Sequence, residues 1–139
     1  MEIAQINSWD NVLSFVTHLT LNGGSNNSIE NTIPKSITHL KFGCYSNQSI
    51  KNCFRYDAFS VCQNPSLVTH LTFGFYFNQS IKVCILSSVK HLRFGHHFNQ
   101  SIKNCIPSSI TYLEFYKKFE KFKMKHVPSS VEKLKFIIP

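Results

Sequence analysis

One pattern of apolar and polar positions recurs along most of the chain. It reads apolar–x–x–Leu–x–apolar, and its last three positions alternate as the two faces of a short β-strand do. The pattern occurs six times, around Leu19, Leu40, Leu71, Leu92, Leu113 and Leu134. These leucines lie 21 residues apart, except for one interval of 31. The sequence therefore predicts six copies of one structural unit, with one insertion of ten residues.

Other positions keep the same register as the leucine. A proline stands six residues before it in four copies, at Pro34, Pro65, Pro107 and Pro128, and Gly43, Gly74 and Gly95 stand three residues after it, where a turn is expected. A single short strand cannot bury its own inner face. We therefore expect the copies to stack at a strand spacing of about 4.8 Å, as a mostly β solenoid with one continuous parallel sheet.

The segments between the strands resemble a known repeat. Phe77-Asn-Gln-Ser-Ile81 and Phe98-Asn-Gln-Ser-Ile102, followed by Ile106-Pro-Ser-Ser-Ile110 and Leu113-x-Phe115, look like the FNIP repeat, a relative of the leucine-rich repeat known from amoebae and giant viruses. The resemblance covers residues 13–136. It implies a leucine-rich-repeat-like solenoid of about six 21-residue coils, with a parallel sheet on the concave side, and it implies no catalytic residues.

The repeats divide the chain into three parts. Residues 1–12 are expected to form an N-terminal cap around Trp9, and residues 13–115 hold the FNIP-like repeats, with the insertion within 54–64. Residues 116–139 contain a degenerate last repeat and a C-terminal cap. Insertions in solenoids form loops, often on the binding face, so Tyr56 and Phe59 are expected to contact either a partner or the solenoid flank; we favour the flank.

The positions on either side of each leucine point away from the core if the strands alternate. Histidines precede the leucine at His18, His39, His70 and His91, and Thr20, Lys41, Thr72, Arg93, Glu114 and Lys135 follow it. On the central strands the predicted partner-binding residues are His39, Lys41, His70, Thr72, His91 and Arg93. A row of parallel imidazoles does not converge tetrahedrally, so a partner-facing or solvated row is favoured over a metal site.

Two further columns are assigned to structure. Asn26, Asn47, Asn78 and Asn99 each begin an Asn-x-Ser sequon, but we interpret them as a ladder that ties the turns of adjacent coils together. Cys53, Cys84 and Cys105 share a column that also accepts Thr32 and His126. Because no two cysteines form a close pair, they are predicted to be buried thiols, with no metal and no cofactor.

Charge and hydropathy narrow the functional classes. The net charge is +8, and residues 116–139 carry seven lysines against Glu120 and Glu132. The cluster Lys117, Lys118, Lys121, Lys123 and Lys125 is typical of a cap that blunts a sheet edge. No apolar stretch approaches the roughly 18 residues of a membrane span, and the first residues lack a secretion pattern. We expect a soluble monomer in the cytoplasm, that of the host cell if the protein is viral.

The function predicted from these features is protein–protein interaction through the concave face, with an unidentified protein partner. An enzyme is not expected, because the chain has seven acidic residues in all, no nucleophile beside a base and no phosphate-binding glycine loop. The alternative is a binder of nucleic acid or another anionic surface through the C-terminal lysines.

Overall fold

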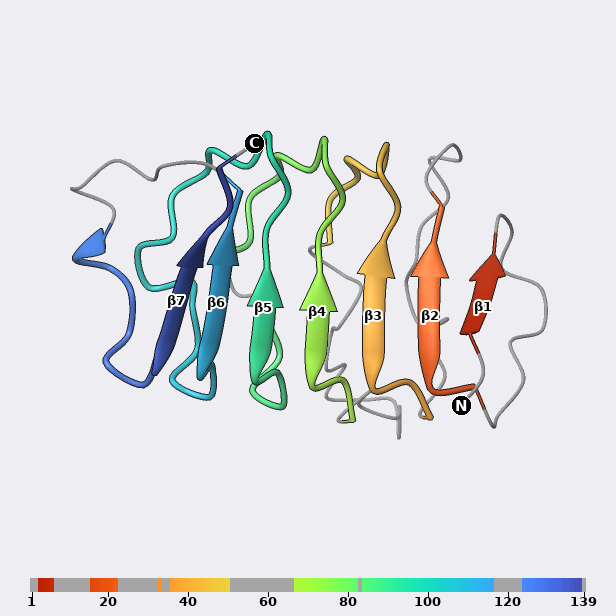
Figure 1. Ribbon diagram of the computed structural model, residues 1–139, viewed down its shortest axis with the longest axis horizontal. Coiled ribbons are helices and arrows are strands. Elements are labelled where there is room, and N and C mark those ends of the chain that lie inside the picture. Colours follow the sequence, from red (N-terminus) through yellow and green to blue (C-terminus); the bar gives the residue numbers. More distant parts are fainter. Residues whose placement is uncertain are drawn as a thin grey trace, which may run out of the picture.

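The described strands form one parallel sheet of seven strands in sequence order (Figure 1). This computed structural model describes residues 3–6 (backbone only), 16–22, 33, 36–50, 67–82, 84–116 and 124–138. The strands are β1 (Ile3–Ile6), β2 (His18–Leu21), β3 (His39–Phe42), β4 (His70–Thr72), β5 (His91–Arg93), β6 (Tyr112–Phe115) and β7 (Lys133–Phe136). From β2 to β7 each leucine pairs with the leucine of the next strand, so the repeat period sets the register.

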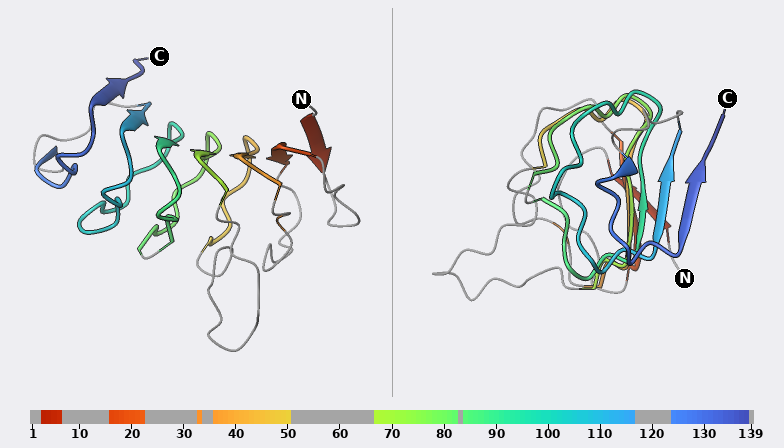
Figure 2. Two further views of the ribbon diagram at one scale, coloured as in Figure 1. Left: turned by 90° about the horizontal axis from the view of Figure 1, so that it is seen from below. Right: turned by 90° about the vertical axis from the view of Figure 1, so that its left-hand side faces the viewer.

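The chain winds as a solenoid whose strands lie on the inner side of a curved stack (Figure 2, left). The described return segments are almost entirely turns and extended chain, as the short repeat predicts. The leucine-rich-repeat-like solenoid with a sheet on its concave side is therefore confirmed.

A seventh strand, β1, lies in the segment predicted to form the N-terminal cap. It pairs with β2 in parallel, with Ala4 opposite Leu19, only fifteen residues later in the chain. The repeat pattern did not predict this strand because β1 carries neither the leucine nor the 21-residue spacing. Trp9 lies outside the described residues.

The core is filled by the inward columns of the strands and by the phenylalanines of the return segments. Five of the repeat leucines are at most 2% exposed, namely Leu19, Leu40, Leu71, Leu92 and Leu113. The phenylalanines at or directly after the strand ends stack along the solenoid, with centroid distances of 5.5 Å for Phe42–Phe73 and 5.4 Å for Phe73–Phe94. Phe77 packs on Phe73 at 4.1 Å, and Phe98 packs on Phe94 at 4.0 Å. The Phe-Asn-Gln-Ser-Ile segment thus contributes its phenylalanine to the core.

The glycines after the strands allow the coils to approach each other closely. A Cβ on Gly95 would lie 1.8 Å from the carbonyl oxygen of Gly74, and a Cβ on Gly74 would lie 1.9 Å from that of Gly43. No described glycine has a positive φ. The glycine column is therefore required by coil spacing, in addition to marking the turn.

Asparagine side chains link adjacent coils at the surface. Asn47 Oδ1 accepts a hydrogen bond from the backbone N–H of Asn78 at 2.8 Å, and Asn78 Oδ1 accepts one from the backbone N–H of Asn99 at 2.8 Å. Gln100 Nε2 also donates to Asn78 Oδ1, at 3.1 Å. Asn47 and Asn99 are exposed, so these bonds lie in contact with water. Asn26 lies outside the described residues.

The two described members of the cysteine column are free thiols with local hydrogen bonds. Cys84 is buried and donates to the carbonyl of Lys82, and Cys105 is half-buried and donates to that of Lys103. Burial raises the pKa of the Cys105 thiol. Cys53 lies outside the described residues.

Candidate binding site on the concave face

The six predicted partner-binding residues lie in two parallel rows across β3, β4 and β5. His39 pairs with His70 and His70 with His91 in one row, and Lys41, Thr72 and Arg93 pair in the other. Along β3 the half-buried His39, buried Leu40, exposed Lys41 and buried Phe42 show the alternation that creates these rows. The in-register pairing thus brings together side chains that are 21 or 31 residues apart in the sequence.

The histidines form a continuous stack. The ring centroids of His18, His39, His70 and His91 are separated by 4.0, 3.9 and 4.2 Å, with interplanar angles of 10° to 13°. Tyr112 on β6 extends the stack at 5.4 Å from His91. Each ring face within the stack is therefore covered by a neighbouring ring.

A threonine hydroxyl fixes each of the first three rings. Thr17, Thr38 and Thr69 place Oγ1 at 2.9 Å from Nδ1 of the following histidine. Burial, followed by repulsion from neighbouring histidines, lowers the pKa of His39 below 6.5 and that of His70 to about 4. His39 and His70 are consequently neutral at pH 7, and the central part of the stack is uncharged.

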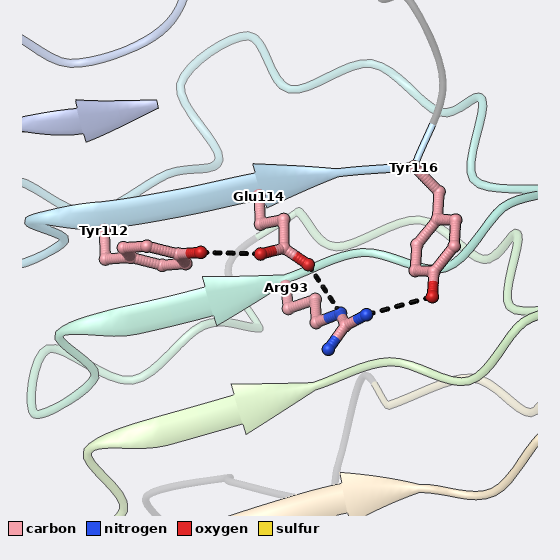
Figure 3. Close-up of polar contacts among 4 residues, drawn as sticks. All are labelled: Arg93, Tyr112, Glu114 and Tyr116. Carbon is pink, nitrogen blue, oxygen red and sulfur yellow. Dashed lines mark hydrogen bonds and ion pairs between the residues drawn. The ribbon is translucent and has the colours of Figure 1, made fainter. Parts of the chain in front are cut away.

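A second polar cluster connects β5 and β6 (Figure 3). Arg93 Nε lies 2.7 Å from Glu114 Oε1, and Arg93 Nη2 donates to the hydroxyl oxygen of Tyr116 at 3.0 Å. The hydroxyl of Tyr112 donates to Glu114 Oε2 at 2.6 Å, a bond that raises the pKa of Tyr112. Glu114 is only 4% exposed. Its Oε1 is held by the ion pair rather than by a well-aligned hydrogen bond.

Arg93 and Lys41 therefore differ in how far other side chains hold them in place, although the sequence predicted the same role for both. Arg93 is positioned by its contacts with Glu114 and Tyr116. Lys41 is exposed, and no ion pair to it is present among the described residues.

Beside these rows lies an aromatic edge, which we define as Tyr45, Phe75, Tyr76, His96 and His97. The repeat pattern alone did not predict this surface. Tyr45, Tyr76 and His97 stack at 5.4 and 4.9 Å, and Phe75 stacks on His96 at 4.9 Å. Tyr45 is 73% exposed and Tyr76 is 42% exposed. The sequence feature that marks the aromatic edge is an aromatic or histidine residue at one or both of the two positions after Gly43, Gly74 and Gly95.

An open pocket of about 240 Å³ lies where the rows meet the aromatic edge. Its walls come from successive coils and include Lys41, Cys44, Thr72, Phe75, Arg93 and Tyr116. Small-molecule sites are commonly about 300–1,000 Å³, so this pocket has the size of a single large side chain rather than of a cofactor.

Several predicted features fall partly or wholly outside the part of the chain that the structure describes. The insertion at 54–64 and four of the five clustered lysines lie there, whereas Lys125 is described and exposed. Within the described ranges, no three His, Cys, Asp or Glu side chains are arranged to hold a metal ion. No helix in those ranges has the length and apolar character needed to cross a membrane.

Stacked coils, one parallel sheet and outward rows on its concave face define a leucine-rich-repeat-like solenoid. The FNIP Repeat family model matches residues 14–45, 25–54, 63–97, 77–118 and 98–137, and the chain belongs to this repeat family. No match was found among curated proteins. A matching solved structure is that of CroV588 from a giant virus, a circular LRR protein, with 34% sequence identity and a TM-score of 0.68. The match covers 90% of this chain and 18% of that chain.

Proposed function

We propose that this chain is a protein-interaction module that binds its partner through the concave face and has no catalytic activity. FNIP repeats and leucine-rich-repeat-like solenoids are consistent with an interaction module, and such solenoids are typically non-catalytic scaffolds. The observation that carries the proposal is the pair of in-register rows on β3, β4 and β5. Such rows offer polar groups and ring edges over an extended surface, as protein interfaces do.

The free thiols support a cytoplasmic location. Cys44, Cys84 and Cys105 form no disulfide bonds, as is usual in a reducing compartment. We infer that the module works there as a monomer, with an unidentified protein as its partner.

Peptide display tests the proposed surface. A library of random dodecapeptides is selected on the parent protein, and each enriched peptide is then measured on Thr72→Trp and Ser87→Trp. Thr72 lies at the centre of the second row, whereas Ser87 is exposed in a turn outside both rows. We expect Thr72→Trp to weaken most enriched peptides by at least about tenfold, because a bulky side chain at the centre of an interface blocks docking. If the enriched peptides bind both variants as tightly as they bind the parent, binding lies elsewhere and the proposal is overturned.

A further inference from the structure

On the concave face of the described strands, the basic residues outnumber the acidic ones. In the outward positions of the described strands, the charged residues are Lys41, Arg93, Glu114, Lys133 and Lys135. Glu114 is the only acid in this set, and it is paired with Arg93. The surface is therefore complementary to an acidic partner.

We propose that the pocket between Lys41 and Arg93 receives a carboxylate from an acidic, extended segment of the partner protein, whose apolar side chains pack against the aromatic edge. The inference rests on the proposed function and adds the chemistry of the partner. The proposed contact is centred on this pocket and does not extend along the full length of the solenoid.

The two cations line this pocket in different ways. Lys41 on β3 and Arg93 on β5 lie in one row, on either side of Thr72, and both contribute to the pocket wall. Arg93 uses Nε for Glu114 and Nη2 for Tyr116, and its remaining guanidinium nitrogen has no contact with the residues drawn in Figure 3. A guanidinium has five N–H donors, so Arg93 keeps donors for a carboxylate while its position is fixed.

The charge of the pocket matches one carboxylate. Lys41 and Arg93 in the pocket wall contribute two positive charges, and Glu114, which pairs with Arg93 from outside the wall, contributes one negative charge, so the net charge is +1. A single carboxylate neutralises that charge.

The aromatic edge favours a peptide over single-stranded nucleic acid. Bases bind to proteins by stacking on free ring faces. In the Tyr45–Tyr76–His97 stack, neighbouring rings cover the faces that they turn towards each other. The same holds for the rings of the histidine row. Few ring faces are therefore left for bases to stack on, whereas exposed rings and tyrosine hydroxyls suit apolar and polar side chains of a peptide.

The test compares a lysine in the pocket with a matched lysine outside it. Lys41→Gln and Lys135→Gln remove the same charge from the same outward column, on β3 and β7 respectively, and only Lys41 lines the pocket. The probe is a fluorescent dodecapeptide with alternating Glu and Ser around one central Tyr, and the control probe has Gln in place of every Glu. Both are measured on the parent and on both variants.

We expect the Glu probe to bind the parent more tightly than the Gln probe does. Lys41→Gln should weaken the Glu probe about five- to tenfold, as expected for the loss of one charge-assisted contact, and Lys135→Gln should weaken it less than about twofold. The bound Glu probe should also slow alkylation of Cys44, an exposed thiol of the pocket, as read by mass spectrometry of the Cys44 peptide.

Three results would overturn the inference. They are equal binding of the two probes, equal effects of the two lysine variants, and tighter binding of a twelve-residue oligothymidylate that depends on Lys41. In each case, display-selected peptides that still require Thr72 would leave the proposed function standing. The absence of any Thr72-dependent peptide would instead remove the proposed function itself.

Discussion

At the level of single residues, several polar positions make the same contact in more than one coil. Ser36, Ser88 and Ser130 each donate to a carbonyl of the preceding coil, at 2.6 to 2.9 Å. Asn47 and Asn78 each accept the N–H of the next asparagine. These side chains pair backbone groups that the strand pairing leaves unsatisfied.

Asn78 tests this idea. Asn78→Ala removes the acceptor for the backbone N–H of Asn99 and for Gln100 Nε2. Because the site contacts water, which replaces the lost acceptor in part, we expect a decrease of about 0.5–1.5 kcal/mol in the free energy of unfolding, measured with urea. Asn78→Asp keeps an acceptor oxygen and should restore most of that stability. If the Ala and Asp variants are equally unstable, the hydrogen bond does not explain the asparagine.

At the level of elements, the strands β2 to β5 each contribute one imidazole ring to a stack, and burial in this stack favours neutral His39 and His70. His70 lies between His39 and His91, with centroids at 3.9 and 4.2 Å. Its pKa is lowered from 6.5 to about 4, with burial as the largest cause. The folded state therefore binds a proton at this site less readily than the unfolded chain does.

The sign of the pH dependence follows from that shift. The stabilisation from neutral His70 is fully present above pH 6.5, the ordinary histidine pKa, and is lost as the pH falls towards about 4. We expect the melting temperature to decrease across this window. His70→Phe keeps a ring in the stack without a titrating group, so its melting temperature should decrease less between pH 7 and pH 4.5. Parallel profiles for the parent and His70→Phe would show that His70 does not contribute to the acid sensitivity.

At the level of the whole molecule, each coil contacts mainly its neighbours, so stability depends on position along the stack. Leu92 lies between two coils and is fully buried, whereas Leu134 lies in β7 and is only half-buried. Terminal coils therefore have a smaller share of the core.

A leucine comparison measures this difference. We expect Leu92→Ala to lower the free energy of unfolding by about 3 kcal/mol, and Leu134→Ala to lower it by about 1 kcal/mol, because the cost rises with the cavity that is left. Denaturant titration of both variants by circular dichroism is the measurement. Equal losses would show that the last coil is packed as tightly as the central ones.

The linear sequence determined the repeat, the register and the inward columns. A period of 21 residues, interrupted once by the ten-residue insertion, places each repeat leucine opposite the next one. Alternation along a strand then separates Leu40 and Phe42 from His39 and Lys41. These features depend only on local spacing, so the fold class and the two outward rows were predictable.

Only the tertiary structure decided which outward residues are fixed and which are free. Arg93 is engaged by Glu114 and Tyr116, whereas Lys41 stays unpaired among the described residues, because these contacts depend on neighbours in other coils. The aromatic edge likewise arises when turns from successive coils meet. Strand β1 lacks the repeat pattern, and its pairing becomes possible only because β2 offers an open parallel edge.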